Sequence, residues 1–397
     1  MSLLTVDDLQ VEGKRVLMRV DFNVPLDNNQ RITDDFRIQA ALPTINKLVD
    51  QGARVVLMSH LGRPKGQVVK ELSLKPVAEY LRNHFKHVAF TSDCVGDVAE
   101  EVVNSAKKGS VILLENLRFH AGEKANDPEF AEQLSALGDV YVNNAFGTCH
   151  RAHASMAGVA KHFEQRAIGD LVEKEIKFLK GKVSNPTHPY TAVMGGAKVS
   201  DKIQIIDKII KKADHLLIGG GMCFTFLKAK GYDVGNSLVE EEKLDLAKDL
   251  MEKAEEENCK LTLPVDVVCA EEIEENVPAH TVDVESIPDG EMGLDIGEKT
   301  IDEFSEILEN SKTVLWNGPM GVFEIEKFSK GTFKIAHKLA DITAKGAITI
   351  IGGGDSASAI KEAGLMEQVS HVSTGGGASL ALIGGEKMEP LELISVK

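Results

Sequence analysis

Short runs of apolar residues recur along the chain and alternate with longer stretches in which apolar positions follow the period of a helix. The runs begin at Arg15, Arg54, Val111 and Asp139 in the first half, and at Tyr190, His215, Lys260, Thr313, Ala347 and Val369 in the second. Short apolar runs of this kind are typical of parallel strands that are buried on both faces. The alternation of strand and helix predicts two doubly wound α/β domains with parallel sheets, whose ligands bind at the carboxyl ends of the strands.

One helix is expected between the two halves. The apolar positions that recur on a single helical face are Ile168, Leu171, Val172, Ile176 and Leu179. The stretch 184–186, Ser-Asn-Pro, should end this helix. We therefore expect domains at residues 1–166 and 186–383, joined by a linker helix at 167–185. An ordinary packed helix of the first domain would explain the same pattern.

The composition is that of a folded protein with two domains. A chain of 397 residues exceeds what one hydrophobic core usually supports. Its formal net charge of -16 argues against nucleic acid or an anionic membrane as a partner. An anionic substrate would need a local basic patch to overcome the general repulsion.

Cysteine spacing and the amino-terminal residues favour a cytoplasmic location. The five cysteines form no close-spaced pair, which disfavours a disulfide framework and a zinc knuckle. The first residues lack a basic segment followed by a long apolar core, so a signal peptide is not expected. The longest uncharged apolar stretch, 216–227, is too short to span a bilayer, which needs about 20 residues.

Arginine is distributed very unevenly. All ten arginines lie at or before Arg166, whereas the second half carries lysine and no arginine. Because the guanidinium group binds phosphate and carboxylate through a planar fork of donors, this distribution predicts a small-anion site in the first half.

The candidate ligands of this anion site follow predicted strands. They are Asp21, Asn23, His60, Arg63, Arg118 and Arg151, joined by Arg37 from the segment Asp34-Asp-Phe-Arg37. Strand ends in such a fold point into one cleft, so these side chains are expected to converge. For any single arginine a surface ion pair is the simpler explanation, and the prediction rests on the set.

Four histidines raise the question of a metal site in the same half. They are His60, His120, His150 and His153. Although the last two are three residues apart, no third ligand follows at a supportive spacing, so zinc is not expected.

Glycine clusters follow apolar runs in the second half, at 195–196, 219–221, 352–354 and 375–377. Such turns let a backbone pass close to a phosphate. The GxxxxGK[ST] string of many NTPases is absent. A carboxylate beside a phosphate-binding turn commonly holds magnesium, which makes Asp355 a candidate ligand, with a helix N-cap as the alternative.

Further polar residues of the second half are placed to contact a nucleotide. Lys198 and Lys202 are expected at the start of a helix, whose N-terminus would reinforce their attraction for phosphate. Asn317 and Glu324 lie in the turn after another predicted strand and could bond to a base or to ribose hydroxyls, although Asn-Gly-Pro is a turn signal in its own right.

Two other functions compete with a nucleotide-dependent transferase. The stretch 352–357 satisfies GxGxxA, the weak signature of a nicotinamide-dependent oxidoreductase, but residues 369–374 offer no acid for a ribose. A non-catalytic anion-binding protein would explain the arginines. An anion-binding function would not explain the lysines of the second half, Glu324 or Asp355.

Eight motifs together resemble phosphoglycerate kinase, in that family's order and over essentially the whole chain. They are RVDFNVP, SHLGRP, ENLRFH, HRAHAS, GGAKVSDK, LWNGPMGVFE, GGGDS and STGGGAS. The resemblance implies two Rossmann-like domains with a cleft between them, and a segment 384–397 that returns to the first domain. It implies a monomer that transfers a phosphoryl group reversibly between 1,3-bisphosphoglycerate and ADP with Mg²⁺, giving 3-phosphoglycerate and ATP in glycolysis.

The resemblance also assigns residues. It implies that 3-phosphoglycerate is held by Asp21, Asn23, Arg37, His60, Arg63, Arg118 and Arg151. It implies nucleotide contacts by Lys202, Gly219, Gly220, Gly221, Gly293, Glu324, Gly353, Gly354, Asp355 and Ser356, with Asp355 on magnesium. It places Arg37, Lys198, Lys202, Gly375 and Gly376 near the phosphoryl group in transfer.

The mechanism expected for such a reaction needs no general base, because the acceptor carboxylate is already ionised at neutral pH. The difficulty is that an anion must attack a polyanion. Most of the stabilisation of the transition-state charge should come from Arg37, Lys198, Lys202, magnesium and helix N-termini. With the reactants on separate domains, closure is expected to bring them in line and exclude water.

Overall fold

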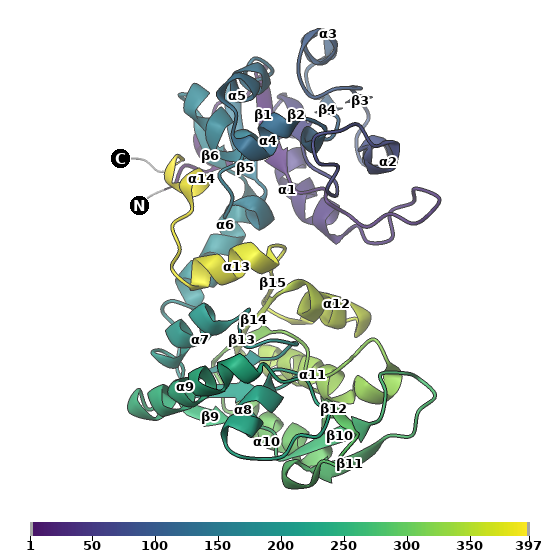
Figure 1. The fold of residues 1–397 in the computed structure, drawn as a ribbon. Coiled ribbons are helices and arrows are strands. Elements are labelled where there is room, and N and C mark those ends of the chain that lie inside the picture. Colours follow the sequence, from purple (N-terminus) through teal and green to yellow (C-terminus); the bar gives the residue numbers. More distant parts are fainter. Residues whose placement is uncertain (1–2, 395–397) are drawn as a thin grey trace. The chain divides into compact units, whose positions relative to one another are not determined.

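The computed structural model describes residues 3–394, which form two compact units (Figure 1). Unit 1 contains the residues up to Ile176 together with those from Lys387 onward, and unit 2 contains Lys177–Glu386. Each unit is built on a six-stranded parallel sheet with helices packed on it. The doubly wound α/β fold class predicted from the strand–helix alternation is confirmed.

The sheet of unit 1 has the strand order β3-β4-β2-β1-β5-β6, and every neighbouring pair is parallel. Its strands are β1 (Arg15–Val20), β2 (Arg54–Met58), β3 (Val88–Phe90), β4 (Val111–Leu113), β5 (Val140–Asn144) and β6 (Arg166–Ile168). The central strand β1 is buried over all but its first residue, which explains why its sequence is an apolar run without alternation.

Seven α-helices belong to unit 1 within the described residues. They are α1 (Phe36–Asp50), α2 (Lys75–Leu81), α3 (Asp97–Ser105), α4 (Ala121–Ala125), α5 (Pro128–Ser135), α6 (Asp170–Ile176) and α14 (Glu389–Glu392). Local sequence explains where α5 begins, because the Asp127 side chain accepts a hydrogen bond from the Phe130 amide and Pro128 occupies the first helical position. The short helix α14 brings the end of the chain back to unit 1, where Glu389 pairs with Lys161 at 3.0 Å.

The sheet of unit 2 has the order β15-β14-β13-β7-β8-β9 and is also parallel throughout. Its strands are β7 (Tyr190–Met194), β8 (His215–Ile218), β9 (Lys260–Thr262), β13 (Thr313–Asn317), β14 (Ile348–Gly352) and β15 (His371–Val372). The first strand of the unit, β7, lies centrally beside β13, so the chain changes winding direction between these two strands. In doubly wound sheets this is the position at which ligands bind.

The helices of unit 2 cover both sheets of that unit. They are α7 (Ile203–Ile210), α8 (Cys223–Ala229), α9 (Leu244–Glu256), α10 (Glu298–Glu309), α11 (Lys330–Ala344), α12 (Gly354–Glu362) and α13 (Gly376–Ile383). Trp316 on β13 is fully buried in the core of this unit, together with Phe304 of α10 and Leu339 of α11.

A second, three-stranded antiparallel sheet in unit 2 was missed by the sequence analysis. It has the order β11-β10-β12 and consists of β10 (Asp266–Ala270), β11 (His280–Asp283) and β12 (Met292–Ile296). The run from Lys260 predicts one strand, whereas the structure has two, because Pro264, which has no amide hydrogen, lies between the end of β9 and the start of β10.

The segment expected to be one linker helix at 167–185 differs from that expectation. Ile168 belongs to β6, and its amide donates to the Leu4 carbonyl at 2.8 Å. The helix begins at Asp170 as α6 and continues as a π-helical segment over Lys177–Lys182. Apolar periodicity could not separate the last strand residue from the helix that follows it. The division between the two units falls within this helical segment.

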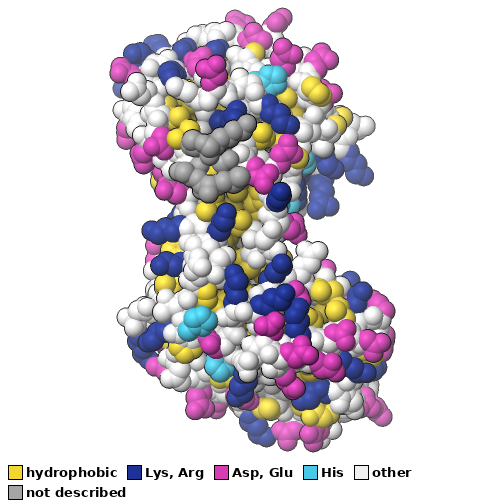
Figure 2. Space-filling model, turned by 90° about the vertical axis from the view of Figure 1, so that its left-hand side faces the viewer, with side chains coloured by type: hydrophobic (Ala, Val, Ile, Leu, Met, Phe, Trp, Pro, Cys, Tyr) yellow, Lys and Arg dark blue, Asp and Glu magenta, His cyan; other side chains and the backbone are white. Residues whose placement is uncertain are grey.

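The surface of the molecule is rich in acidic side chains. On the face drawn in Figure 2, Asp and Glu side chains are spread over each unit and interspersed with Lys and Arg, in keeping with the net charge of -16. Among the described residues, no helix combines the length and apolarity required to cross a membrane.

Candidate functional site

Some of the candidate residues follow the two strands between which the winding direction changes, β1 and β5 in unit 1 and β7 and β13 in unit 2. In unit 1, Asp21 comes directly after β1, and Arg151 lies on the segment after the neighbouring strand β5. In unit 2, Gly195 comes directly after β7, and Gly318 directly after β13. Because the sheets are parallel, the segments in each pair leave the same edge of their sheet.

In unit 1 the loop after β1 and the first turn of α1 bring three predicted residues together. Arg37 Nη1 lies 3.1 Å from Asp21 Oδ2 and donates to the Asn23 carbonyl at 3.2 Å. The Asn23 side chain in turn accepts from the Gly62 amide at 2.8 Å. Asp21 Oδ1 is 3.8 Å from His60 Nδ1, too far for a hydrogen bond. The Arg37 side chain remains 34% exposed, so its outer donors can reach a ligand.

His60 lies buried within a group of arginines. Arg19 Nη2 is 3.0 Å from His60 Nδ1, and since a guanidinium group can only donate, Nδ1 accepts and the ring proton is on Nε2. Burial lowers the pKa of His60 well below its usual value, and the positive charges of Arg19, Arg118, Arg151 and Arg37 lower it further. The imidazole is therefore neutral at pH 7, and Nε2 is a neutral donor.

Arg118 and Arg151 complete this positive group. Arg118 is almost fully buried and donates from Nη1 to the Gly62 carbonyl at 2.7 Å. Its Nε is buried and has no hydrogen-bond partner in the described structure. Burial, followed by the charges of Arg151 and Arg19, lowers the pKa of Arg118 to about 10. A buried donor without a partner among like charges fits an anion-binding site.

Arg63, also predicted, is exposed on the loop after β2, three residues beyond His60. His153, for which the sequence did not favour a metal role, lies near the arginines; burial and then the positive charge of Arg118 lower its pKa to about 4, so its ring is neutral at pH 7.

Arg19 is the residue that the sequence reasoning missed. It is fully buried on β1, and its Nε donates to the Ser155 hydroxyl at 2.9 Å. The Ser155 hydroxyl donates to the buried Glu123 carboxylate at 2.6 Å. Arg19 therefore links the end of β1 to two other segments and holds His60 in one tautomer. The signal was present, because a charged residue inside an apolar strand is almost never buried unless it is paired.

In unit 2, Lys202 lies at the turn between β7 and α7. Its Nζ donates to the Gly195 carbonyl at 2.5 Å and to the Asn317 carbonyl at 2.7 Å, and so connects the ends of β7 and β13. Burial lowers the pKa of Lys202 to about 8, although the negative charge of Asp355 opposes this shift. The negative charge of Asp355 only partly offsets the cost of burying the Lys202 ammonium group, so a bound phosphate would stabilise its charged form.

Two glycine turns of unit 2 lie against each other. Gly353 has φ +93° and precedes α12, whose first turn carries the exposed Asp355. A Cβ atom at Gly376 would lie 3.6 Å from both Gly353 Cα and Gly354 N. The backbone amides at the start of α12 are thereby next to the start of α13, which begins at Gly376. Such paired helix N-termini favour an anion.

Several predicted nucleotide residues have packing roles that explain their identity. The Ser356 hydroxyl is buried and accepts from the Gly318 amide at 2.6 Å, so it orders the turn after β13. A side chain at Gly220 would lie 2.7 Å from the Pro319 carbonyl, and one at Gly219 would lie 2.6 Å from the Met320 sulfur.

The remaining predicted residues of unit 2 are divided between buried and exposed positions. A side chain at Gly293 would overlap the Phe224 ring, so glycine is required there for packing. Asn317 is buried, whereas Glu324 is exposed. Lys198 is exposed and lies outside α7, because the helix begins at Ile203; the expectation that both lysines start the helix was wrong for Lys198.

An α/β protein with a buried arginine–histidine group on one unit and a lysine between glycine turns on the other can hold two phosphate-bearing ligands. This combination is typical of an α/β phosphotransferase. The comparisons with known proteins give the family. The family model described as phosphoglycerate kinase matches residues 6–386.

Similar proteins cover almost the whole chain. The phosphoglycerate kinase of Thermosipho africanus is 54% identical over 100% of this chain and 99% of its own length. That of Synechococcus elongatus is 54% identical over 97% of this chain and 96% of its own length. The solved phosphoglycerate kinase from Coxiella burnetii has a TM-score of 0.88 and 41% identity, and covers 99% of both chains. The chain belongs to the phosphoglycerate kinase family.

The reaction of this family is reversible phosphoryl transfer between 1,3-bisphosphoglycerate and ADP, giving 3-phosphoglycerate and ATP. The acceptor in the direction of bisphosphoglycerate is a carboxyl group. The enzyme class and the reaction expected from the motifs are confirmed, and with them the preference over an oxidoreductase.

Proposed function

We propose that the arginine–histidine group of unit 1 binds 3-phosphoglycerate. The residues assigned to this site are Asp21, Asn23, Arg37, His60, Arg63, Arg118 and Arg151. The observation that carries the proposal is the buried Nε of Arg118, which lacks a partner in the described structure, while burial and then the neighbouring positive charges lower the pKa of its guanidinium group. A bound carboxylate or phosphate supplies both the missing acceptor and the missing negative charge.

Unit 2 is assigned to the nucleotide on similar grounds. The contacts proposed are Lys202, Gly219, Gly220, Gly293, Asn317, Glu324, Gly353, Gly354, Asp355 and Ser356, with Lys198, Gly375 and Gly376 toward the transferring group. Lys202 Nζ is held by two main-chain carbonyls, and neither bears a formal charge. A nucleotide phosphate provides the negative charge that this buried ammonium group lacks.

The residues present also fit Mg²⁺. Magnesium is usually bound through one or two carboxylates together with substrate phosphates. Asp355 is exposed in the first turn of α12, next to Gly353 and Gly354, so its carboxylate is free to approach an ion there. When bound, Mg²⁺ would neutralise charge on the nucleotide phosphates.

The transfer itself depends on charge and position. The acceptor carboxylate is ionised at neutral pH, so no side chain has to remove a proton from it. His60 suits this requirement, because it is neutral and its Nε2 is a hydrogen-bond donor. Arg37, held at 3.1 Å by Asp21, and Lys202 are proposed to stabilise the negative charge on the transferring oxygens. Since the two ligands are assigned to different units, domain closure is proposed to bring the reactants in line and exclude water.

Separate binding measurements test the two assignments. Titration calorimetry with 3-phosphoglycerate alone and with MgADP alone should show that Arg118→Ala abolishes binding of 3-phosphoglycerate and leaves MgADP binding intact. Lys202→Met should weaken MgADP binding and spare 3-phosphoglycerate. If both variants lost both ligands while remaining folded, the division of the ligands between the units would be wrong.

Other expectations from the sequence stay predictions. They concern the monomeric state, the absence of nucleic acid and membrane partners, and the cytoplasmic location. Size-exclusion chromatography with light scattering measures the first directly.

A further inference from the structure

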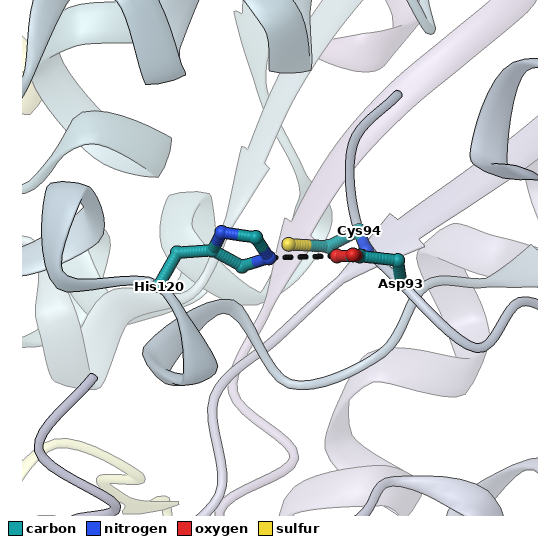
Figure 3. Close-up of side chains that lie close together, drawn as sticks. All are labelled: Asp93, Cys94 and His120. Atoms are coloured by element: carbon teal, nitrogen blue, oxygen red, sulfur yellow. Dashed lines mark hydrogen bonds and ion pairs between the residues drawn. The ribbon is translucent and has the colours of Figure 1, made fainter. Parts of the chain in front are cut away.

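Three side chains with different ligand atoms meet in unit 1 in a group that no step of the phosphoryl transfer uses. Asp93 and Cys94 lie on the segment between β3 and α3, and His120 directly precedes α4 (Figure 3). One carboxylate oxygen, the Cys94 sulfur and one imidazole nitrogen all lie within 4.8 Å of one another. His120 Nε2 is 2.7 Å from Asp93 Oδ1. Among the described residues this is the one group of at least three such ligands.

The ligand types favour a particular class of cation. Mg²⁺ and Ca²⁺ are bound by oxygen, and a thiolate with an imidazole would be a poor site for either. Zn²⁺ accepts sulfur, nitrogen and oxygen together, and sites with three protein ligands take water as the fourth. Along the chain the four histidines considered for zinc lack a supporting third ligand, whereas the fold combines His120 with two residues from another loop.

The geometry needs only small movements to bind such an ion. Bonds of about 2.0 Å to nitrogen and oxygen and about 2.3 Å to sulfur, at tetrahedral angles, separate ligand atoms by roughly 3.3–3.6 Å. His120 Nε2 and Asp93 Oδ1, which are 2.7 Å apart, would separate by about 0.6–0.9 Å, and a pair at the 4.8 Å limit would approach by about 1.2–1.5 Å. The Asp93 loop is ordered by hydrogen bonds, since the Cys94 amide donates to Asp93 Oδ1 at 2.6 Å and the Thr91 hydroxyl donates to the Asp93 carbonyl.

Burial and charge in the group also suit a cation. The Cys94 side chain is buried, while the side chains of Asp93 and His120 are 45% and 34% exposed, so an ion can enter from solvent and reach the sulfur last. The carboxylates of Asp93, Glu123 and Glu115 lie near the Cys94 sulfur, and their negative charges attract a divalent ion.

We propose that Asp93, Cys94 and His120 bind one Zn²⁺, with water as the fourth ligand. On binding, the Cys94 thiol releases its proton to the buffer and a zinc–sulfur bond forms, while His120 coordinates through Nε2 as the neutral ring. The hydrogen bond between His120 and Asp93 is replaced by two bonds to the metal. The site lies in unit 1, apart from the Asp355 carboxylate assigned to the nucleotide's Mg²⁺.

The test uses the full chain without nucleotide and titrates it with ZnCl₂, and with CoCl₂ as a spectroscopic probe of the same site. The wild-type protein should bind one Zn²⁺, and its Co²⁺ form should show a thiolate-to-metal charge-transfer band. His120→Asn and Cys94→Ser should each weaken Zn²⁺ binding by about 100-fold or more, since loss of a second-shell partner alone typically costs 10–100-fold. In Cys94→Ser the charge-transfer band should be absent.

Matched controls separate this site from ordinary surface binding. His188 and Asp214 form another exposed pair at 2.7 Å, so His188→Asn removes an equivalent imidazole without a cysteine beside it. Cys223→Ser removes another buried thiol. Both controls should bind Zn²⁺ as the wild type does.

Two results would overturn the proposal. One is a Co²⁺ spectrum of the wild-type protein without a thiolate band. The other is equal Zn²⁺ affinity in His120→Asn and His188→Asn, which would mean that the Asp93–His120 contact is only a hydrogen bond of the loop. Because His120 is partly exposed, its variant should fold even if Cys94→Ser does not, and circular dichroism would verify this.

Discussion

Arg37 offers the sharpest test of how the enzyme stabilises charge. Its guanidinium group is fixed by Asp21 at 3.1 Å and by the Asn23 carbonyl at 3.2 Å, yet a third of the side chain stays accessible to a ligand. Arg37→Ala removes this positive charge and leaves the Asp21 carboxylate, which is 8% exposed, without that partner. The substitution therefore acts on the transferring group and on the local field around it.

The expected loss is mainly catalytic. Removing one preorganised donor from a transition state typically costs about 2.7–4 kcal/mol, so kcat should fall by roughly 10²–10³-fold. The KM for 3-phosphoglycerate should rise as well, because the Asp21 charge then repels the anion. Stability should also fall, because the buried Asp21 carboxylate loses this partner; the loss should lie between the value for an exposed ion pair, about 1 kcal/mol, and that for a fully buried one, about 3–5 kcal/mol. Each kcal/mol corresponds to a Tm shift of about 2–4 °C for a unit of this size.

The assay couples the reaction of MgATP and 3-phosphoglycerate to glyceraldehyde-3-phosphate dehydrogenase and follows NADH. Arg15→Ala is the matched control, because Arg15 pairs with Asp139 at 2.7 Å from the opposite end of β1. It should keep kcat near the wild-type value although it too loses an ion pair. An Arg37→Ala enzyme with wild-type kcat, or a control with an equally large loss, would refute the catalytic role.

Three further predictions concern unit 2. The pKa of Lys202 is lowered to about 8, and a bound phosphate stabilises its charged form, so ADP binding at pH 8.5 should take up a proton. Calorimetry in two buffers of different ionisation enthalpy measures this proton uptake. Lys202→Met should abolish the uptake. Gly318→Ala should lower Tm more than Gly346→Ala. Both glycines have φ +96°, but only a side chain at Gly318 would overlap neighbouring atoms, which include the Gly195 carbonyl and Lys202 Nζ. Equal losses of Tm would show that only the backbone conformation matters. Burial raises the pKa of Asp295 to about 7, so the folded chain retains a proton that the unfolded chain releases from about pH 4, and this group's contribution to stability should fall as pH rises from 4 to 7. The Tm of Asp295→Asn relative to wild type should therefore increase over that range, and a constant difference would contradict the raised pKa.

The sequence predicted strands and candidate ligands correctly where a residue's role depends on its neighbours along the chain. The apolar runs predicted all six strands of the parallel sheet of unit 2 and four of the six in unit 1, because a strand buried on two faces must be apolar throughout; β3 and β6 were not predicted. Candidate ligands at strand ends could also be selected from the sequence, because all strands of a parallel sheet end at the same edge. Asp21, Asn23 and Arg37 are brought together by one loop and one helix start.

The boundaries of helices and strands, and the antiparallel sheet of unit 2, could not be predicted from the sequence. Ile168 fits the apolar face of a helix and the end of a strand equally well, and only its pairing with β5 assigns it to β6. The antiparallel sheet around β10 was missed because its strands pair across connections of several residues that carry little apolar signal.

The sequence by itself determined the fold class, the division into an arginine-rich and a glycine-rich half, and the family. Tertiary structure alone decided which charges share an environment. Arg19 was not among the residues predicted for the anion site, yet its burial beside His60 fixes the ring's tautomer. Arg118 has a lowered pKa because it is buried and because Arg151 and Arg19 lie near it. Likewise, Asp93, Cys94 and His120 become one ligand set only when two loops meet. Electrostatic energy depends on distance and burial in space, and sequence separation specifies neither.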